Sequence, residues 1–220
     1  MTRFHRLSAL ILLLLAAPFA QAADEGWRLE KDQGGIQIYT RAVEGYKIRE
    51  IRGVVRVQAP LTAVAAMLSD PAISPQISET VSQAKILQRQ GAQRAQVYQV
   101  LDMPWPLDDR DIVVQREIRQ DPKTYAVVIA DSATPEAAPA EKGRVRVQKS
   151  RTQWTLTPQA DGTVETEMRA LTDPNGPIPA SVINSMSVGV PFKSLDKLRT
   201  LAQQPKYRQG KLDFIKEAPR

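Results

Sequence analysis

The stretch that decides the fold is residues 103–114, which read MPWPLDDRDIVV. Strand-like runs flank it, residues 95–101 on one side and residues 112–118 on the other. Because proline fixes φ and donates no backbone N–H, Pro104 and Pro106 exclude a central strand at this point. The stretch is therefore predicted to be a loop that closes one end of a curved sheet.

Two side chains of this loop are candidates for contact with whatever lies beneath it. Trp105 is a large apolar ring, which we expect to cover a ligand or to cap the core. Arg110 is a fixed charge at the mouth of an apolar strand. It is predicted either to meet the polar end of a ligand or to form a structural ion pair with Asp108, Asp109 or Asp111.

The first 22 residues have the pattern of a secretory signal peptide. Arg3 and Arg6 precede an apolar run of 12 residues, 9–20, and a small-x-small cleavage site follows, ending at Ala22. The alternative is an uncleaved anchor, but a membrane-spanning helix needs about 18 apolar residues or more. We therefore expect cleavage after Ala22 and a periplasmic or secreted protein.

The remaining chain, residues 23–220, is long enough for one domain with a substantial core. It contains no cysteine, so packing alone must stabilise it. Loss of two arginines lowers the formal charge from +6 to +4, which suits transient contact with an anionic membrane surface. Without a dense block of Lys and Arg, no nucleic-acid partner is expected. We expect a monomer.

Histidine is present only once, as His5 in the predicted signal peptide. Ser-His-Asp and Cys-His nucleophilic sites are therefore excluded, as are zinc sites built on His or Cys. No glycine-rich phosphate loop is present, and no cofactor is expected. The candidates left for an enzyme are Asp111, Glu117, Glu167 and Tyr98, and none of them forms a recognisable acid–base pair.

Hydrophobic periodicity predicts mostly strands, with one helix early in the chain and a longer one near its end. The predicted strands are residues 36–41, 46–57, 81–87, 94–101, 112–118, 125–130, 144–156 and 164–171. The predicted helices are residues 23–31, anchored by Trp27, residues 61–68, and residues 180–203, with a kink near 187–190 before Pro191. Residues 71–78 are expected to be a loop, residues 131–143 an exposed mobile loop, and residues 206–220 a charged C-terminal tail.

Strands joined by short turns favour an antiparallel sheet, and the long helix must bury its apolar stripe against it. The predicted fold class is α+β, a helix-grip fold in which a curved antiparallel sheet wraps around the C-terminal helix and leaves an internal hydrophobic cavity. For each apolar candidate below, a place in the ordinary core is an equally good interpretation. The candidate lining residues are Val97, Val100, Arg110, Val114, Val127, Trp154, Met168, Ile183, Met186 and Val190.

The sequence also resembles the START domain family of lipid-transfer proteins. The matching pieces come in order: Trp27 and GIQIYTR at 35–41, Lys47, PWPL at 104–107 with RDIV at 110–113, and DPNGPIP at 173–179. The resemblance implies a START-like lipid-binding domain over residues 23–205, with a tunnel for one lipid and the 103–110 loop beside its mouth. It makes Arg110 the candidate contact for the lipid's polar end. The family's acidic position in a middle strand has no clear match.

The predicted function is binding, and transfer, of a lipid or other hydrophobic small molecule without chemistry. One alternative is a small-molecule enzyme, since helix-grip relatives include cyclases and aromatases. Another is a protein-binding module that uses the tail or the 131–143 loop.

Overall fold

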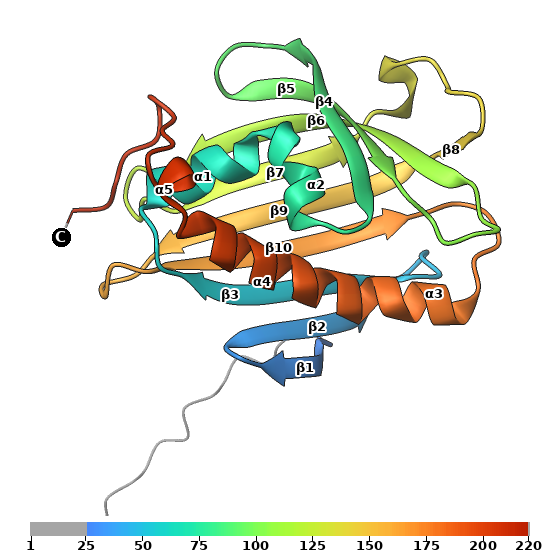
Figure 1. Ribbon diagram of the computed structural model, residues 1–220, viewed down its shortest axis with the longest axis horizontal. Coiled ribbons are helices and arrows are strands. Elements are labelled where there is room, and N and C mark those ends of the chain that lie inside the picture. Colours follow the sequence, from blue (N-terminus) through green and yellow to red (C-terminus); the bar gives the residue numbers. More distant parts are fainter. Residues whose placement is uncertain (1–25, 220) are drawn as a thin grey trace, which may run out of the picture.

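One twisted sheet forms the frame of the molecule (Figure 1). The computed structural model describes residues 26–219, so the predicted signal peptide lies outside the described residues. The sheet runs in the order β1-β2-β3-β10-β9-β7-β6-β5-β4, with antiparallel neighbours, and β8 pairs in parallel with β6. The strands are β1 (Arg28–Gln33), β2 (Ile36–Ala42), β3 (Arg49–Val57), β4 (Val81–Arg89), β5 (Arg94–Leu101), β6 (Asp109–Gln120), β7 (Val127–Ala133), β8 (Arg144–Arg146), β9 (Lys149–Pro158) and β10 (Val164–Asp173).

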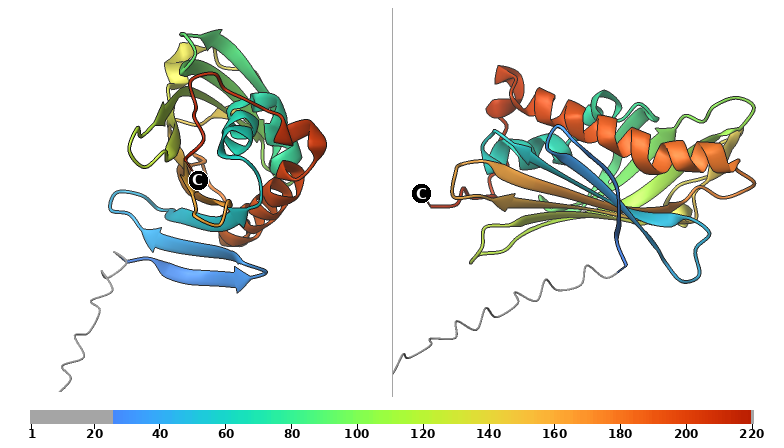
Figure 2. Two further views of the ribbon diagram at one scale, coloured as in Figure 1. Left: turned by 90° about the vertical axis from the view of Figure 1, so that its left-hand side faces the viewer. Right: turned by 90° about the horizontal axis from the view of Figure 1, so that it is seen from below.

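The helices gather on one face of this sheet, with the C-terminal helix lying across it (Figures 1 and 2), except the short η2, which lies over the opposite face. They are α1 (Leu61–Ser69), η1 (Pro71–Ile73), α2 (Ser74–Ile77), η2 (Pro135–Ala137), α3 (Ala180–Asn184), the π-helical turn η3 (Ser185–Gly189), α4 (Val190–Ala202) and α5 (Pro205–Arg208). The predicted α+β helix-grip fold is confirmed. We call the face that packs against α4 the inner face and the opposite one the outer face.

The main core lies between α1, α4 and the inner face. Successive side chains of a strand point to opposite faces of the sheet, and the apolar ones on the inner face form this core. Gly53 of β3 shows how closely α4 approaches. A Cβ atom at this position would lie 2.7 Å from Leu195 Cδ1 and 3.2 Å from Ile38 Cδ1. Both neighbours are fully buried, so glycine is required where the helix crosses the sheet.

The helix predicted over residues 23–31 is wrong where the structure describes it, because residues 28–33 form strand β1. β1 is an edge strand that pairs with β2, and most of its side chains reach water. Such a strand has no apolar alternation for a sequence pattern to detect. Its pairing with β2 supplies the backbone hydrogen bonds that decide its structure.

Three other segments differ from prediction. Residues 71–77 are helical, with Asp70 accepting a hydrogen bond from Ala72 N at 3.0 Å as a local cap. The predicted long strand 144–156 is divided into β8 and β9. β7 extends to Ala133, so Asp131 is a buried strand residue and not part of an exposed loop.

The long C-terminal helix is interrupted where a kink was predicted, by the π-helical turn directly before α4 and its Pro191. Within the described residues, no helix combines the length and the apolar character needed to cross a membrane. The C-terminal segment packs on the fold: Tyr207 and Ile215 are buried, and Glu217 accepts hydrogen bonds from the N-terminal amides of α1, at 3.1 Å from Leu61 N and 2.8 Å from Thr62 N.

Candidate ligand-binding cavity

A cavity of about 260 Å³ lies between the inner face and α4. Most of its walls are apolar, with hydroxyl and amide groups between them. The sheet supplies Ile51, Gln99, Leu101, Ile112, Val114, Ser150, Thr152, Trp154, Met168, Ala170 and Thr172. The helical side supplies Met67, Leu68, Ile73, Ile77, Met186, Val190, Pro191 and Ser194. This is the arrangement expected of a site for a hydrophobic small molecule.

A buried ion pair forms part of the cavity wall. Arg116 of β6 donates to both carboxylate oxygens of Asp131 on β7, from Nε at 2.8 Å and from Nη2 at 2.7 Å. Only 5% of Arg116 and 8% of Asp131 is exposed. Nη1 of Arg116 also donates to the carbonyls of Leu68 and Ser69 at the end of α1, each at 3.2 Å. Burial alone would lower the pKa of Arg116, but the charge and hydrogen bonds of Asp131 raise it above its usual range.

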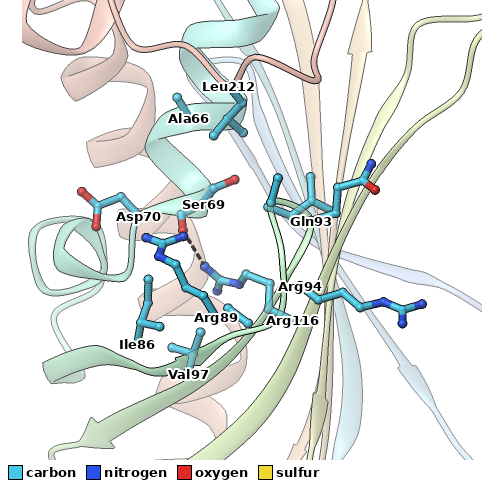
Figure 3. Close-up of a pocket in the computed structure, with 13 residues that line it drawn as sticks. Ala66, Ser69, Asp70, Ile86, Arg89, Gln93, Arg94, Val97, Arg116 and Leu212 are labelled. Carbon is cyan, nitrogen blue, oxygen red and sulfur yellow. Dashed lines mark hydrogen bonds between the residues drawn. The ribbon is translucent and has the colours of Figure 1, made fainter.

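Arg116 also lines a second, smaller recess of about 130 Å³, which lies towards the turn between β4 and β5 (Figure 3). Its other walls come from α1, from that turn, from β4, β5 and β6, and from Leu212 of the C-terminal segment. Figure 3 shows the hydrogen bond from Arg116 to Ser69 at this recess. Arg116 therefore contributes to the walls of both spaces, and its hydrogen bonds tie α1 to the sheet between them.

One side of the main cavity lies between α4 and the segment that leads into β4. There Glu79 accepts hydrogen bonds from Lys193 Nζ and Lys197 Nζ of α4, both at 3.1 Å. The hydrogen bond from Lys193, followed by that from Lys197, lowers the pKa of Glu79 below its usual range. The carboxylate stays charged at neutral pH, so both ion pairs persist there and are lost only in acid.

The family model described as START domain matches residues 17–207. The chain belongs to the START domain family. An uncharacterized protein of Pseudomonas aeruginosa is 33% identical over 196 residues, which cover 87% of this chain and 96% of that protein.

Solved structures agree with this START domain in fold. The crystal structure of a STAR-related lipid transfer protein fragment from Xanthomonas axonopodis has a TM-score of 0.74 and 33% identity, covering 81% of this chain and 99% of that one. Human StAR-related lipid transfer protein 5 has a TM-score of 0.73 at 15% identity, covering 83% of this chain and 89% of that one, which shows likeness in fold alone.

The structure brings five of the predicted site residues of this START domain together in the main cavity: Val114, Trp154, Met168, Met186 and Val190. It places the others elsewhere. Val97 lines the smaller recess, Val127 belongs to the main core, and Ile183 lies on the half-buried helix α3 outside the cavity lining.

Val100 lies on the outer face, where it packs with Tyr98, Val113 and Ala138. The segment after β7 covers this part of the outer face, so β5 is buried on both faces. Alternation alone then cannot tell which residues of β5 point inward, and Gln99 and Leu101 are the ones that line the cavity.

Arg110 does not line the cavity, and within residues 26–219 it forms no ion pair with Asp108, Asp109 or Asp111. Only 3% of it is exposed, and its guanidinium donates to three backbone carbonyls. The acceptors are Pro174 O at 3.0 Å, Asn175 O at 2.9 Å and Asp108 O. Arg110 thus joins the 103–108 loop to the loop that precedes α3.

Trp105 covers nothing in the described chain, because 93% of it is exposed. It lies four residues beyond Leu101, a cavity residue at the end of β5. Thr172, near the end of β10, lines the same cavity, and the loop from there to α3 is the one that Arg110 holds. The loop that carries this exposed indole therefore lies at the end of the cavity where α3 begins.

The candidates for acid–base chemistry are engaged elsewhere. Asp111 is fully buried and accepts from Arg146 Nε at 3.0 Å and Nη2 at 2.8 Å. Burial raises the pKa of Tyr98, whose hydroxyl accepts from Arg144 at 2.7 Å. Glu117 and Glu167 form ion pairs with outer-face arginines. Within residues 26–219, no group of three acidic, His or Cys side chains could hold a metal ion.

Sequence reasoning missed Arg116 and Asp131, although a signal was present. Ile112, Val114, Arg116 and Ile118 alternate along β6, so the arginine stands on the apolar face of its strand. A charge at such a position is seldom buried unless a partner neutralises it. The sequence pattern predicts an exposed loop from residue 131, so it does not place Asp131 on a strand beside Arg116.

Proposed function

We propose that this START domain binds one lipid or other hydrophobic small molecule in the main cavity and transfers it without chemical change. The observation that carries the proposal is the apolar space between the inner face and α4. Burial of apolar surface contributes about 25 cal/mol per Å², before the costs of association, so an acyl chain or ring system suffices for binding.

The Arg116–Asp131 pair supports a ligand with a neutral polar end. Asp131, Leu68 and Ser69 already provide four acceptors for the five N–H donors of Arg116. The pair is neutral as a whole, and an anionic head group beside it would leave one uncompensated negative charge in a poorly solvated site. A hydroxyl fits better, because it accepts from the remaining N–H and donates to the carboxylate.

The positions of the four candidate acid–base residues favour binding over catalysis, since Tyr98, Asp111, Glu117 and Glu167 do not line the cavity. A catalytic group must reach the reacting atoms of a bound molecule. We further propose that the protein works in the periplasm or outside the cell, on the strength of the predicted signal peptide, and that it acts as a monomer.

The proposal predicts that the protein purified under native conditions carries one ligand per chain in native mass spectrometry. Ala170 lines the cavity, so Ala170→Phe is expected to fill it and abolish loading. Ala42→Phe is the matched control, because Ala42 is exposed at the end of β2. An empty protein that takes up no phospholipid, fatty acid or sterol analogue would contradict the proposal, as would equal loading of both variants.

Transfer also requires contact with a membrane, for which Trp105 is the proposed anchor. Tryptophan favours the membrane–water interface, and the loop that carries this exposed indole lies at the end of the cavity. Trp105→Ala is expected to slow lipid transfer between vesicles several-fold while leaving thermal stability unchanged. Leu29→Ala, at an exposed apolar position of β1, is the control. If both variants transferred lipid at the wild-type rate, the anchor would have to lie elsewhere.

A further inference from the structure

The wall of the main cavity contains a carboxamide, that of Gln99 on β5, and in the described part of the chain this side chain has no hydrogen-bond partner. Its neighbours across the sheet are Ala84 on β4 and Ile112 on β6, and neither side chain can donate or accept a hydrogen bond. A carboxamide offers two N–H donors and one carbonyl acceptor. These groups are therefore left for a molecule that occupies the cavity.

Most hydroxyl groups of the same wall differ from this carboxamide, because they pair with one another. The hydroxyl oxygens of Ser78 and Thr80 lie 3.0 Å apart, and those of Ser150 and Thr172 lie 2.7 Å apart. Ser194 of α4 is an exception: only 7% of it is exposed, it lines the cavity, and its hydroxyl has no partner among residues 26–219. Polar groups without partners thus lie on both the sheet side and the helical side of the cavity.

Gln99 and the Arg116–Asp131 pair lie at different places along the cavity. Gln99 is directly opposite Ile112, and Arg116 follows Ile112 by four residues along β6. At about 3.3 Å per residue, the two polar positions are separated by about 13 Å along the strand. Val114 lies between them on the same face and lines the cavity. The sheet wall is thus polar at two positions, with an apolar stretch between them.

A ligand with a polar group at one end only would displace water from the Gln99 carboxamide without replacing its hydrogen bonds. Such a loss lowers affinity. The charged side chains of the wall, Asp70, Arg116 and Asp131, lie together at the other position, since Asp70 follows Ser69, whose carbonyl accepts from Arg116. The group of the ligand that meets Gln99 is therefore expected to be polar and uncharged.

We infer that Gln99 determines specificity and that the ligand is a neutral amphiphile with a polar group at each end, one at Gln99 and one at the Arg116–Asp131 pair. This inference rests on the proposed binding of a hydrophobic molecule in the main cavity and narrows its chemical class. A hydroxyl group suits Gln99, because it accepts from the carboxamide N–H and donates to the carboxamide oxygen. An ester or amide carbonyl can use the N–H donors alone.

The test compares decan-1-ol with decane-1,10-diol, two probes of equal chain length, by isothermal titration calorimetry of the ligand-free protein. The measured quantity is the ratio of their dissociation constants. Gln99→Leu should shift this ratio by about tenfold in favour of decan-1-ol, because leucine offers the second hydroxyl no partner. Gln96→Leu is the matched control, since Gln96 lies on the same strand but three residues away, on the outer face. It should leave the ratio unchanged.

The same ratio in wild type and Gln99→Leu would overturn the inference and leave the proposed function intact, since both probes still bind. An equal shift in Gln96→Leu would also overturn it. Decanedioic acid, charged at both ends at neutral pH, should bind much more weakly than the diol, and equal affinity would contradict a neutral ligand. If wild-type protein bound none of these probes and no phospholipid, fatty acid or sterol analogue, the proposed function would fall and this inference with it.

Discussion

Arg116→Ala is expected to destabilise the protein by about 3–5 kcal/mol, because it leaves the buried carboxylate of Asp131 without its partner. The carbonyls of Leu68 and Ser69 lose their donor in the same substitution. Asp131→Ala should cost a similar amount, since the guanidinium is then the uncompensated charge. Urea denaturation followed by circular dichroism measures both, and midpoints within experimental error of wild type would contradict the expectation.

The double variant Arg116→Met/Asp131→Leu separates the stability of the pair from its role in recognition. Replacing a whole buried pair with apolar side chains of similar volume is often neutral, or stabilising by about 1–4 kcal/mol. We therefore expect this variant to fold while either single variant is damaged. If the pair meets the polar end of the ligand, loading of a hydroxyl-bearing lipid should fall in the double variant, whereas a purely apolar ligand should bind at least as well.

The fold was predictable from the sequence because most strands are buried on one face and exposed on the other. β2 and the first half of β10 alternate between buried and less buried residues, and α1 and α4 carry apolar stripes that pack against the sheet. Strand β1 was not predicted, because neither of its faces is buried and its sequence therefore shows no alternation of apolar and polar residues. Local periodicity detects burial, and it fails where backbone pairing alone decides the structure.

The site was predictable in part, and the misses have a common cause. Met168 and Trp154 were found because they are apolar residues on inward-facing positions. Arg116 and Asp131 were not found, because a buried ion pair between two strands can be predicted only once the pairing of those strands is known. Arg110 drew attention as a charge before an apolar strand, yet its partners are backbone carbonyls, and two of the three lie 64 and 65 residues away in the chain. Every residue has a backbone carbonyl, so the sequence does not indicate which carbonyls accept hydrogen bonds from Arg110.

Arg110→Ala is the second substitution with a large expected effect, a loss of about 2–4 kcal/mol of folding free energy. A buried acceptor without a donor costs about 1–3 kcal/mol, and this variant leaves the carbonyl of Pro174, which is buried, and those of Asn175 and Asp108 without their donors. Asn175 is exposed, so water replaces part of what its carbonyl loses. Arg110→Lys should recover little, because an ammonium group cannot reproduce the planar fork that reaches carbonyls of two loops.

The location of the damage distinguishes a structural Arg110 from a ligand contact. The loop that Arg110 holds leads directly into α3 and the π-helical turn, so amide hydrogen exchange in Arg110→Ala should accelerate over residues 174–189 and remain unchanged in β2 and β3. Because Met186 lines the cavity, faster opening there should raise the rates of ligand uptake and release together and leave the equilibrium affinity nearly unchanged. A contact with the polar end of the ligand predicts the opposite, an affinity that falls while exchange in this segment stays slow. A fall in affinity with slow exchange would show that Arg110 contacts the ligand. The loop that carries Arg110 would then have to rearrange when the cavity is filled.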